Sequence, residues 1–249
     1  MEHWELLRPG GYRFVWDDEL FRPGTDSFLL SSMPRLKRGL RVCDLGSGAG
    51  LLGVLLLQRE PSLTVTELER LPAAVELADR CAALNGLTER LISHCMDLRD
   101  APKRFPTGSF DLIVSNPPYY QGVAPSDSAR RAARHESACT FAELVETAAC
   151  LLRWGGAFCF VHKPERLTDV LCQLRTARCE PKRLRFVCDT PGAAPSLILV
   201  EGRRGGNPGL NVESPLILRR ADGSPTPEYD AIYFRGAPQA TNLSHDAQS

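Results

Sequence analysis

Four consecutive residues, Asn116-Pro117-Pro118-Tyr119, combine groups that could hold a reacting amine. They follow the apolar run 110–115, and two adjacent prolines cannot continue a strand, because each lacks an N–H and has a fixed φ. The predicted strand therefore ends here. The Asn116 side-chain oxygen and the Pro117 carbonyl could accept both hydrogens of a planar –NH2 group, while the Tyr119 ring could stack on its face. The segment predicts a pocket for an aromatic or amide amine, although a strand followed by a simple proline turn has the same pattern.

A glycine-rich turn upstream favours the first of these interpretations. It lies between a predicted strand at 40–44 and a predicted helix at 50–58, an arrangement that lets a backbone approach a nucleotide-like ligand closely. Its glycines are Gly46, Gly48 and Gly50. Gly48 and Gly50, together with Gly53, also satisfy the pattern of dinucleotide-binding proteins, and the acids Glu67 and Glu69 follow near the expected spacing.

The acid at the start of this turn, Asp44, distinguishes the two kinds of ligand. Its carboxylate would repel a pyrophosphate, yet it suits a ligand with an ammonium and a sulfonium group. S-adenosylmethionine carries both, and its own carboxylate could lie near the positive end of the following helix. Glu67, ending a predicted strand at 63–67, could bind two ribose hydroxyls, and Asp97, after a predicted strand at 91–96, could accept from an adenine amino group. Three acids at successive strand ends, with the turn, predict a site for S-adenosyl-L-methionine.

Composition sets broad limits. The chain has 249 residues, enough for one well-buried α/β domain, and its 30 basic and 30 acidic residues balance. A nucleic acid would therefore have to be recognised by local groups of charge. Without an apolar run of transmembrane length or a signal-peptide pattern, we expect a cytoplasmic protein that neither binds membranes nor needs an obligate protein partner. The nine cysteines contain no C-x-x-C pair and the five histidines are scattered, so we expect no metal site.

Predicted strands and helices alternate from residue 39 onward, which indicates a mainly parallel sheet covered by helices on both faces. The further predicted elements are helices at 72–85, 140–152 and 165–177 and strands at 110–115, 157–161, 183–188 and 195–200. We expect an α/β, Rossmann-like fold with a seven-stranded sheet. Its last two strands are joined by a short loop and should form an antiparallel hairpin at the sheet edge.

The chain divides into three predicted parts. The segment 1–38 should pack over the cofactor site, with β-like stretches near 12–14 and 19–21 and a short helix for which Thr25 or Asp26 is the expected N-cap. Residues 39–202 should form the core. Residues 203–249 should form an extension that adds an edge strand near 215–218 and ends in about a dozen disordered residues.

A long connection at 120–138 follows the Asn-Pro-Pro-Tyr segment. Connections of this length are usually functional, and this one leaves the sheet at the edge where α/β sheets bind ligands. Its basic side chains could contact the phosphates of a polynucleotide or form an ordinary solvated surface. They are Arg130, Arg131 and Arg134.

With these motifs the chain resembles class I S-adenosylmethionine-dependent methyltransferases that act on amino groups. The motifs alone fit adenine-N6 enzymes of DNA and RNA as well as glutamine-N5 enzymes of release factors. Further stretches are similar to the small bacterial tRNA adenine-N6 methyltransferases, and the likeness spans roughly residues 12–234. These stretches are 21–30, 116–120 with 133–136, and 215–218 through Asp222-Gly223 to Tyr229. Within the connection, residues 122–130 depart from that family, with no recognisable motif.

The resemblance implies methyl transfer to the N6 atom of adenosine 37, beside the anticodon of a valine tRNA. It also implies roles for particular residues. The catalytic residues would be Asn116, Pro117 and Tyr119. The cofactor would be bound by Thr25, Asp26 and Asn116, together with Asp44, Glu67, Asp97 and the glycines of the turn, Gly46, Gly48 and Gly50. The substrate would be bound by Tyr119, Tyr120, Arg130, Arg131 and Arg134.

Three alternatives stay open. Glutamine-N5 enzymes carry an added N-terminal helical domain, whereas about 38 residues precede the first core strand here. A DNA enzyme would need a target-recognition region, and no insertion of that size is evident. A non-catalytic module binding the cofactor or RNA fits the chain length, but mere binding would leave the Asn-Pro-Pro-Tyr motif without a purpose.

Overall fold

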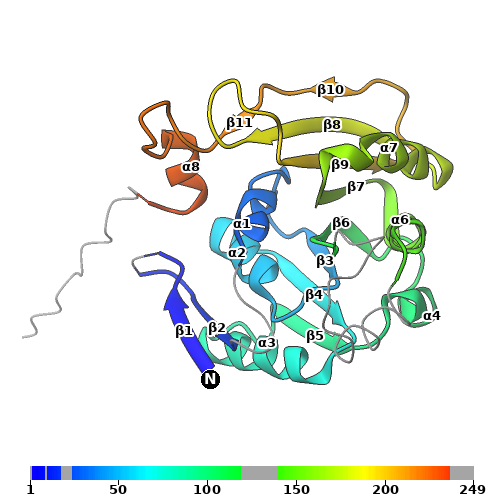
Figure 1. Ribbon diagram of the computed structural model, residues 1–249. Coiled ribbons are helices and arrows are strands. Elements are labelled where there is room, and N and C mark those ends of the chain that lie inside the picture. Colours follow the sequence, from blue (N-terminus) through cyan, green and yellow to red (C-terminus); the bar gives the residue numbers. More distant parts are fainter. Residues whose placement is uncertain (1, 9, 18–23, 119–138, 236–249) are drawn as a thin grey trace, which may run out of the picture.

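The apolar segments of the chain assemble into a mixed sheet of nine strands (Figure 1). The computed structural model describes residues 2–8, 10–17, 24–118 and 139–235. The sheet strands are β3 (Arg41–Leu45), β4 (Thr64–Glu69), β5 (Leu91–Cys95), β6 (Phe110–Ser115), β7 (Leu152–His162), β8 (Cys179–Cys188), β9 (Leu197–Arg204), β10 (Asn211–Val212) and β11 (Leu216–Ile217). Their order is β10-β8-β9-β7-β6-β3-β4-β5, and β11 also pairs with β8.

Most strand pairs are parallel. Strands β7, β6, β3, β4 and β5 run in one direction, so their carboxyl ends meet at one edge of the sheet. Strand β9 is antiparallel to both of its neighbours, β7 and β8, and with β8 it forms the expected hairpin. The short strands β10 and β11 extend the sheet beyond β8. Strand β11 is the edge strand expected near 215–218, whereas β10 was not predicted, because a two-residue strand leaves no periodic pattern in a sequence.

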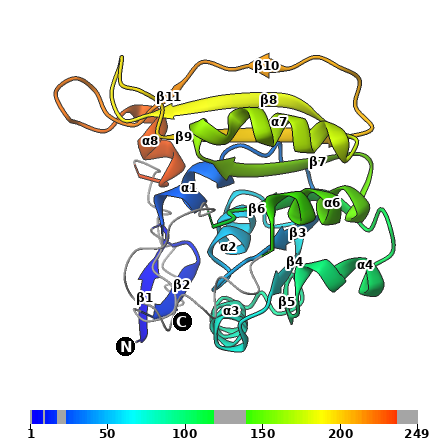
Figure 2. The same cartoon turned by 45° about the vertical axis from the view of Figure 1, so that its right-hand side comes forward.

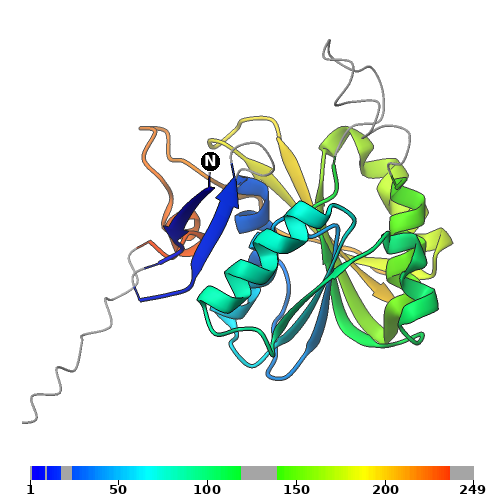
Figure 3. The same ribbon diagram turned by 90° about the horizontal axis from the view of Figure 1, so that it is seen from below.

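Helices cover both faces of the sheet (Figures 2 and 3). They are α1 (Thr25–Ser31), α2 (Leu51–Arg59), α3 (Pro72–Leu84), α4 (Ala101–Arg104), α6 (Phe141–Leu151), α7 (Leu167–Thr176) and α8 (Pro227–Ile232), with 3-10 turns η1 (Leu98–Asp100) and η2 (Pro164–Arg166). Successive strand residues point to opposite faces. On β3, for example, Val42 packs in the cluster that contains α1, α2 and α3, whereas Cys43 packs in the cluster that contains α6 and α7.

Local chemistry explains several helix boundaries. Thr140 and Glu143 form a reciprocal capping box at the start of α6, and Pro72 occupies the first turn of α3, where its missing N–H has no cost. At α1 the sequence prediction was wrong: the N-cap is Gly24, without a side-chain cap, and both Thr25 and Asp26 lie inside the helix.

Four strands differ clearly from their predicted limits. Strand β8 begins at Cys179 instead of at 183, and β9 ends at Arg204 instead of at 200. Strand β4 continues past Glu67 to Glu69, and β7 begins at Leu152, directly after α6, instead of at 157. The early part of β7 contains Gly155 and Gly156, which are typical of turns, and its pairing with β6 shifts register there. The two glycines and the register shift explain why the sequence pattern did not predict the first residues of this strand.

An N-terminal hairpin packs on the outside of α3. Strands β1 (Glu2–Leu6) and β2 (Arg13–Asp17) pair antiparallel, and Asn85 at the end of α3 exchanges two hydrogen bonds, of 2.8 and 2.7 Å, with the Arg13 backbone. The expected stretch at 12–14 thus belongs to β2, and β1 was not predicted. The expected stretch at 19–21 and the final dozen residues lie outside the described part of the chain.

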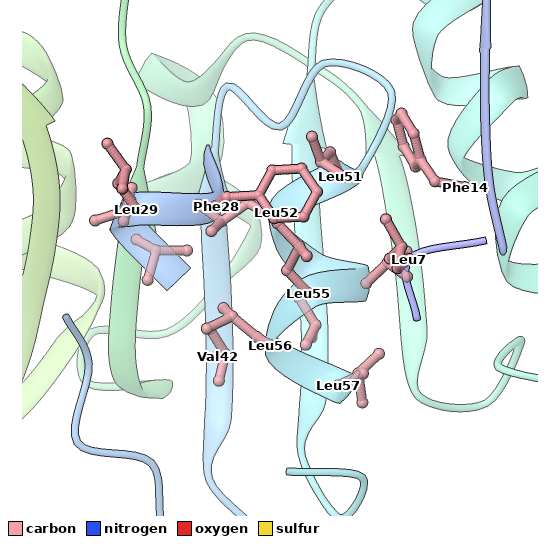
Figure 4. Packing of buried hydrophobic residues seen from close by; sticks show 14 of the residues in the cluster. Leu7, Phe14, Phe28, Leu29, Val42, Leu51, Leu52, Leu55, Leu56 and Leu57 are labelled. Atoms are coloured by element: carbon pink, nitrogen blue, oxygen red, sulfur yellow. The ribbon is translucent and has the colours of Figure 1, made fainter. Parts of the chain in front are cut away.

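Helix α1 is held between α2, β7 and α8. Figure 4 shows Phe28 of α1 packing beside Leu52 of α2. On the other side, the Phe28 ring stacks on Tyr233 with centroids 4.3 Å apart. Among the described residues, no helix has the length and apolar character needed to cross a membrane.

Candidate active site

The glycine turn and Asn116 lie at the same edge of the sheet. Asp44 on β3 pairs directly with Val114 on β6, two residues before Asn116. The carboxyl ends of β3 and β6 are also joined by a hydrogen bond of 2.7 Å from Ser115 Oγ to the Leu45 carbonyl. Neighbouring parallel strands therefore bring together two segments that are far apart in the sequence, as the prediction of a shared pocket requires.

The turn after β3 has a backbone that favours glycine at three positions. The φ angles of Gly46, Gly48 and Gly50 are 75°, 57° and 82°, in a region that L-residues with side chains seldom adopt. Gly50 is the N-cap of α2, and no side-chain cap is present at this helix start. The N–H groups of the first turn, with the positive end of the helix dipole, thus face the carboxyl edge and suit a carboxylate.

Two polar side chains at this turn are buried without hydrogen-bond partners among the described residues. They are Asp44, through Oδ2, and Ser47, through Oγ. Burial raises the pKa of Asp44 well above its usual value, and the nearby Glu67 and Glu69 raise it further. Unsatisfied buried polar atoms cost roughly 1–3 kcal/mol each. A ligand with an ammonium group would satisfy this carboxylate, so the site fits the predicted cofactor.

Glu67 lies deeper than the sequence suggested. Its side chain is fully buried, and a Cβ atom built on Gly53 of α2 would lie 2.3 Å from Glu67 Oε1. Ser93 Oγ on β5 donates a 3.0 Å hydrogen bond to the other carboxylate oxygen. Burial raises the pKa of Glu67 to about 7. This acid therefore lies beneath the start of α2, and the tip of β4 is two residues further on.

The acid at the tip of β4 is Glu69, which the sequence prediction did not assign to the site. Its Oε2 accepts a 3.0 Å hydrogen bond from the Gly48 N–H of the glycine turn, and its Oε1 accepts from the N–H groups of Arg70 and Leu71. One signal in the sequence could have located it. Pro72 favours the first turn of a helix, so the strand has to end just before residues 70–71.

Asp97 lies two residues beyond the end of β5, where it caps η1. Its oxygens accept from the Arg99 backbone and guanidinium, at 2.6 to 2.9 Å. These hydrogen bonds lower the pKa of Asp97, so the acid stays ionised. Asp97 is near the edge where it was predicted, but it already has a cationic neighbour.

Asn116 meets α1 across the site. Its side-chain Nδ2 donates a 3.1 Å hydrogen bond to Ser27 Oγ, so the helix that contains Thr25 and Asp26 lies beside the end of β6. Pro117 is half-buried next to it. The remaining predicted site residues lie outside the described part of the chain; they are Tyr119, Tyr120, Arg130, Arg131 and Arg134. In the parts of the chain that the structure covers, no group of His, Cys, Asp and Glu side chains could hold a metal ion.

This arrangement can be compared with known proteins. Residues 23–176 match the family described as the methyltransferase small domain, and the chain belongs to this family. Two curated relatives are the tRNA1(Val) (adenine(37)-N6)-methyltransferases of Yersinia pestis (strain Pestoides F) and Yersinia pseudotuberculosis (serotype O:3, strain YPIII), each 31% identical over 236 residues. Those alignments cover 90% of this chain and 92% and 90% of the two relatives.

Solved structures share the fold. A predicted O-methyltransferase from Agrobacterium tumefaciens is 22% identical, with a TM-score of 0.71 over 84% of this chain and 96% of the other. A geranyl diphosphate methyltransferase in complex with its substrate and sinefungin is 17% identical, with a TM-score of 0.53 over 71% and 76% of the two chains. The predictions of a Rossmann-like α/β fold, a methyltransferase and S-adenosyl-L-methionine as methyl donor are confirmed.

Proposed function

We propose that this protein methylates the exocyclic N6 of an adenine in tRNA, and that the adenine is position 37 of a valine tRNA. The observation that carries the proposal is the placement of Asn116 on the strand next to the glycine turn, with its amide fixed by α1. The names of relatives that align over 90% of the chain support the choice of substrate. Action on tRNA agrees with a cytoplasmic location, and the proposal includes no obligate protein partner.

Asn116 and Pro117 would hold the amine. When bound, S-adenosyl-L-methionine supplies a methyl group carried on a positively charged sulfur. Asn116 Oδ1 and the Pro117 carbonyl would accept the two hydrogens of the adenine amino group, which favours a more pyramidal nitrogen with its lone pair out of the ring plane. Tyr119 would stack on the base. The acceleration would come from alignment of the reacting atoms and from well-placed dipoles, without a strong base.

Several acids would hold the cofactor. Asp44 and Ser47, with their unsatisfied buried atoms, would bind the ammonium group, and the start of α2 would bind the carboxylate. For the ribose we propose Glu69 in place of Glu67, because Glu69 is at the strand tip against Gly48. Each carboxylate oxygen has two lone pairs, so its backbone hydrogen bonds leave capacity for ribose hydroxyls. Asp97 would accept from the adenine amino group of the cofactor.

The substrate side of the site would be completed by the segments that flank it. The N-terminal segment would close over the cofactor, with Thr25 and Asp26 of α1 beside Asn116. Tyr120, Arg130, Arg131 and Arg134 would bind the RNA. An adenine in an anticodon loop has to swing out of its stack to enter the site, at a cost of a few kcal/mol. Single-stranded loops are the usual targets of sequence-specific RNA recognition.

The direct test is methyl transfer from labelled cofactor to purified valine tRNA, with DNA and a release factor as competing acceptors. We expect label in tRNA alone and N6-methyladenosine after digestion. Asn116→Ala should lower turnover by about two orders of magnitude, as expected for loss of one preorganised polar contact, while cofactor affinity measured by calorimetry barely changes.

A matched control is Asn211→Ala, which removes an exposed amide from β10, far from the glycine turn in the sheet order. It should leave turnover unchanged. If the label appeared in the release factor or in DNA, that molecule and not tRNA would be the substrate. Normal turnover by Asn116→Ala would show that the amine is held elsewhere.

A further inference from the structure

We propose that Ser27 is a positioning residue: by accepting a hydrogen bond from Asn116 Nδ2, it fixes the orientation of the amide so that Oδ1 faces the amine to be methylated. The inference deepens the proposed function and depends on it for the identity of the amine. It assigns a catalytic consequence to a serine of the N-terminal helix, 89 residues before Asn116 in the sequence.

The chemistry of an amide side chain makes its orientation important. One end of the amide donates hydrogen bonds and the other accepts them, and the last torsion of asparagine has two broad preferred states that exchange the two ends. With the ends exchanged, N–H groups would point at an –NH2 group that also donates. The 3.1 Å contact from Nδ2 to Ser27 Oγ places the donor end against α1 and turns the acceptor end away from this helix.

Ser27 can serve as a fixed point because its helix is firmly held. Its own side chain is 3% exposed. The next residue, Phe28, packs against α2 (Figure 4). It also stacks on Tyr233 of the C-terminal segment, with an interplanar angle of 4°. Three successive apolar side chains of α1 are buried, from Phe28 to Leu30. They anchor the helix independently of the serine hydroxyl.

This anchoring separates a positioning role from a structural one. If the hydrogen bond served only to attach α1 to the sheet, its loss would lower stability and affect cofactor and tRNA binding together. If it orients Asn116, its loss would act mainly on the chemical step, since the apolar contacts of α1 would stay in place. The split between kcat and KM therefore distinguishes the two roles.

The experiment compares Ser27→Ala with Ser27→Thr and Ser31→Ala. Removing the hydroxyl should lower kcat for tRNA methylation about tenfold, the equivalent of one ordinary hydrogen bond, with KM for tRNA and Kd for the cofactor within about twofold. Threonine keeps the hydroxyl and should restore most of the lost kcat.

Ser31→Ala is the matched control, because Ser31 is fully buried on the same helix. Its hydroxyl donates to the Phe28 carbonyl and accepts from Arg59, but it does not contact Asn116 in the described structure. The control should lower the Tm and leave kcat unchanged. In an Asn116→Ala background, Ser27→Ala should cause no further loss of kcat, because the two residues act through one contact.

A second readout needs no turnover. In an NMR spectrum of protein with isotope-labelled asparagine side chains, the Asn116 amide protons should shift on Ser27→Ala and return towards wild type with Ser27→Thr. An unchanged kcat in a folded Ser27→Ala protein, or an unchanged amide spectrum, would overturn the positioning role. If wild-type protein does not methylate tRNA at all, the proposed function fails, and the NMR comparison still decides the role of Ser27.

Discussion

Buried acids at the two ends of the sheet have opposite surroundings. On β9, Glu201 is 2% exposed, yet its carboxylate contacts Arg183 at 2.7 Å and Arg203 at 3.3 Å. On β3 and β4, Asp44 and Glu67 are equally buried and directly opposite each other in register. No ion pair joins either of them to a basic side chain in the part of the chain that is described.

The difference separates acids whose charge is balanced within the fold from acids that the fold leaves unpaired. At β8, Arg183 also contacts Glu213 at 2.6 Å, and its hydrogen bond lowers the pKa of Glu213. At the glycine turn, burial raises the pKa of both acids instead. A protein loses stability by burying unpaired carboxylates, and such groups are concentrated at functional sites. The unpaired carboxylate of Asp44 therefore supports the proposal that the cofactor binds beside the glycine turn, whereas Glu67 lies one layer deeper, beneath Gly53.

Arg183→Met should have the largest effect. It leaves Glu201 buried with its main partner removed, and breaking a buried pair in this way costs about 3–5 kcal/mol. Urea denaturation measures the loss, which should not be accompanied by weaker cofactor binding in the folded fraction. The control is Arg175→Met, whose side chain is 64% exposed beside Glu180; it should cost under about 1 kcal/mol. Equal losses of stability from the two variants would show that the buried pair of Arg183 and Glu201 matters no more than an exposed pair.

Asp44→Asn should show the opposite pattern at the other end of the sheet. We expect cofactor affinity to fall by about 1.5–3 kcal/mol, the range for a hydrogen bond to a charged group, because a neutral amide attracts an ammonium group less strongly than a carboxylate does. Stability without cofactor should stay level or rise, since one buried acid is gone. Calorimetric titration and urea denaturation of the same protein test both parts. Unaltered affinity would place the ammonium group elsewhere.

Glu67→Gln should produce the smallest change, and it depends on pH. The pKa of Glu67 is raised from 4.5 to about 7, so the folded state holds a proton that the unfolded chain loses first. The stability from this group is fully present below pH 4.5 and is lost as pH rises through about 7. Glutamine should remove that dependence and stabilise the protein by on the order of 1 kcal/mol near pH 8.

The matched variant is Glu69→Gln, two residues along the same strand. It should weaken cofactor binding, whereas Glu67→Gln should have little effect on it, because Glu67 lies beneath Gly53. If the affinities change in the reverse order, the ribose partner is Glu67, as the sequence predicted.

The sequence was sufficient for the fold and for the position of the main motifs. Apolar runs and glycine turns indicated alternating strands and helices in a mainly parallel sheet, and the shared carboxyl ends of parallel strands bring Asp44 and Asn116 to one edge. The sequence was insufficient where the role of a residue depends on how deeply its side chain is buried or on contacts with residues far away in the chain. Glu67 and Glu69 have the same residue type and face, and only the end of the strand distinguishes them. The contact of Ser27 with Asn116 leaves no local pattern at all.

The C-terminal helix α8 and the residues after it help to hold α1 in place. Arg59 Nη2 donates to the Ile232 carbonyl at 2.9 Å, and its guanidinium lies 4.8 Å from the centre of the Phe234 ring. The Tyr233 ring stacks on Phe28 of α1. A nascent chain still lacking these contacts would have the glycine turn and Asn116, but it would hold α1 only through α2 and β7. We therefore expect enzyme activity to begin only after residues 227–235 have left the ribosome, which would prevent half-made protein from acting on tRNA during its own translation.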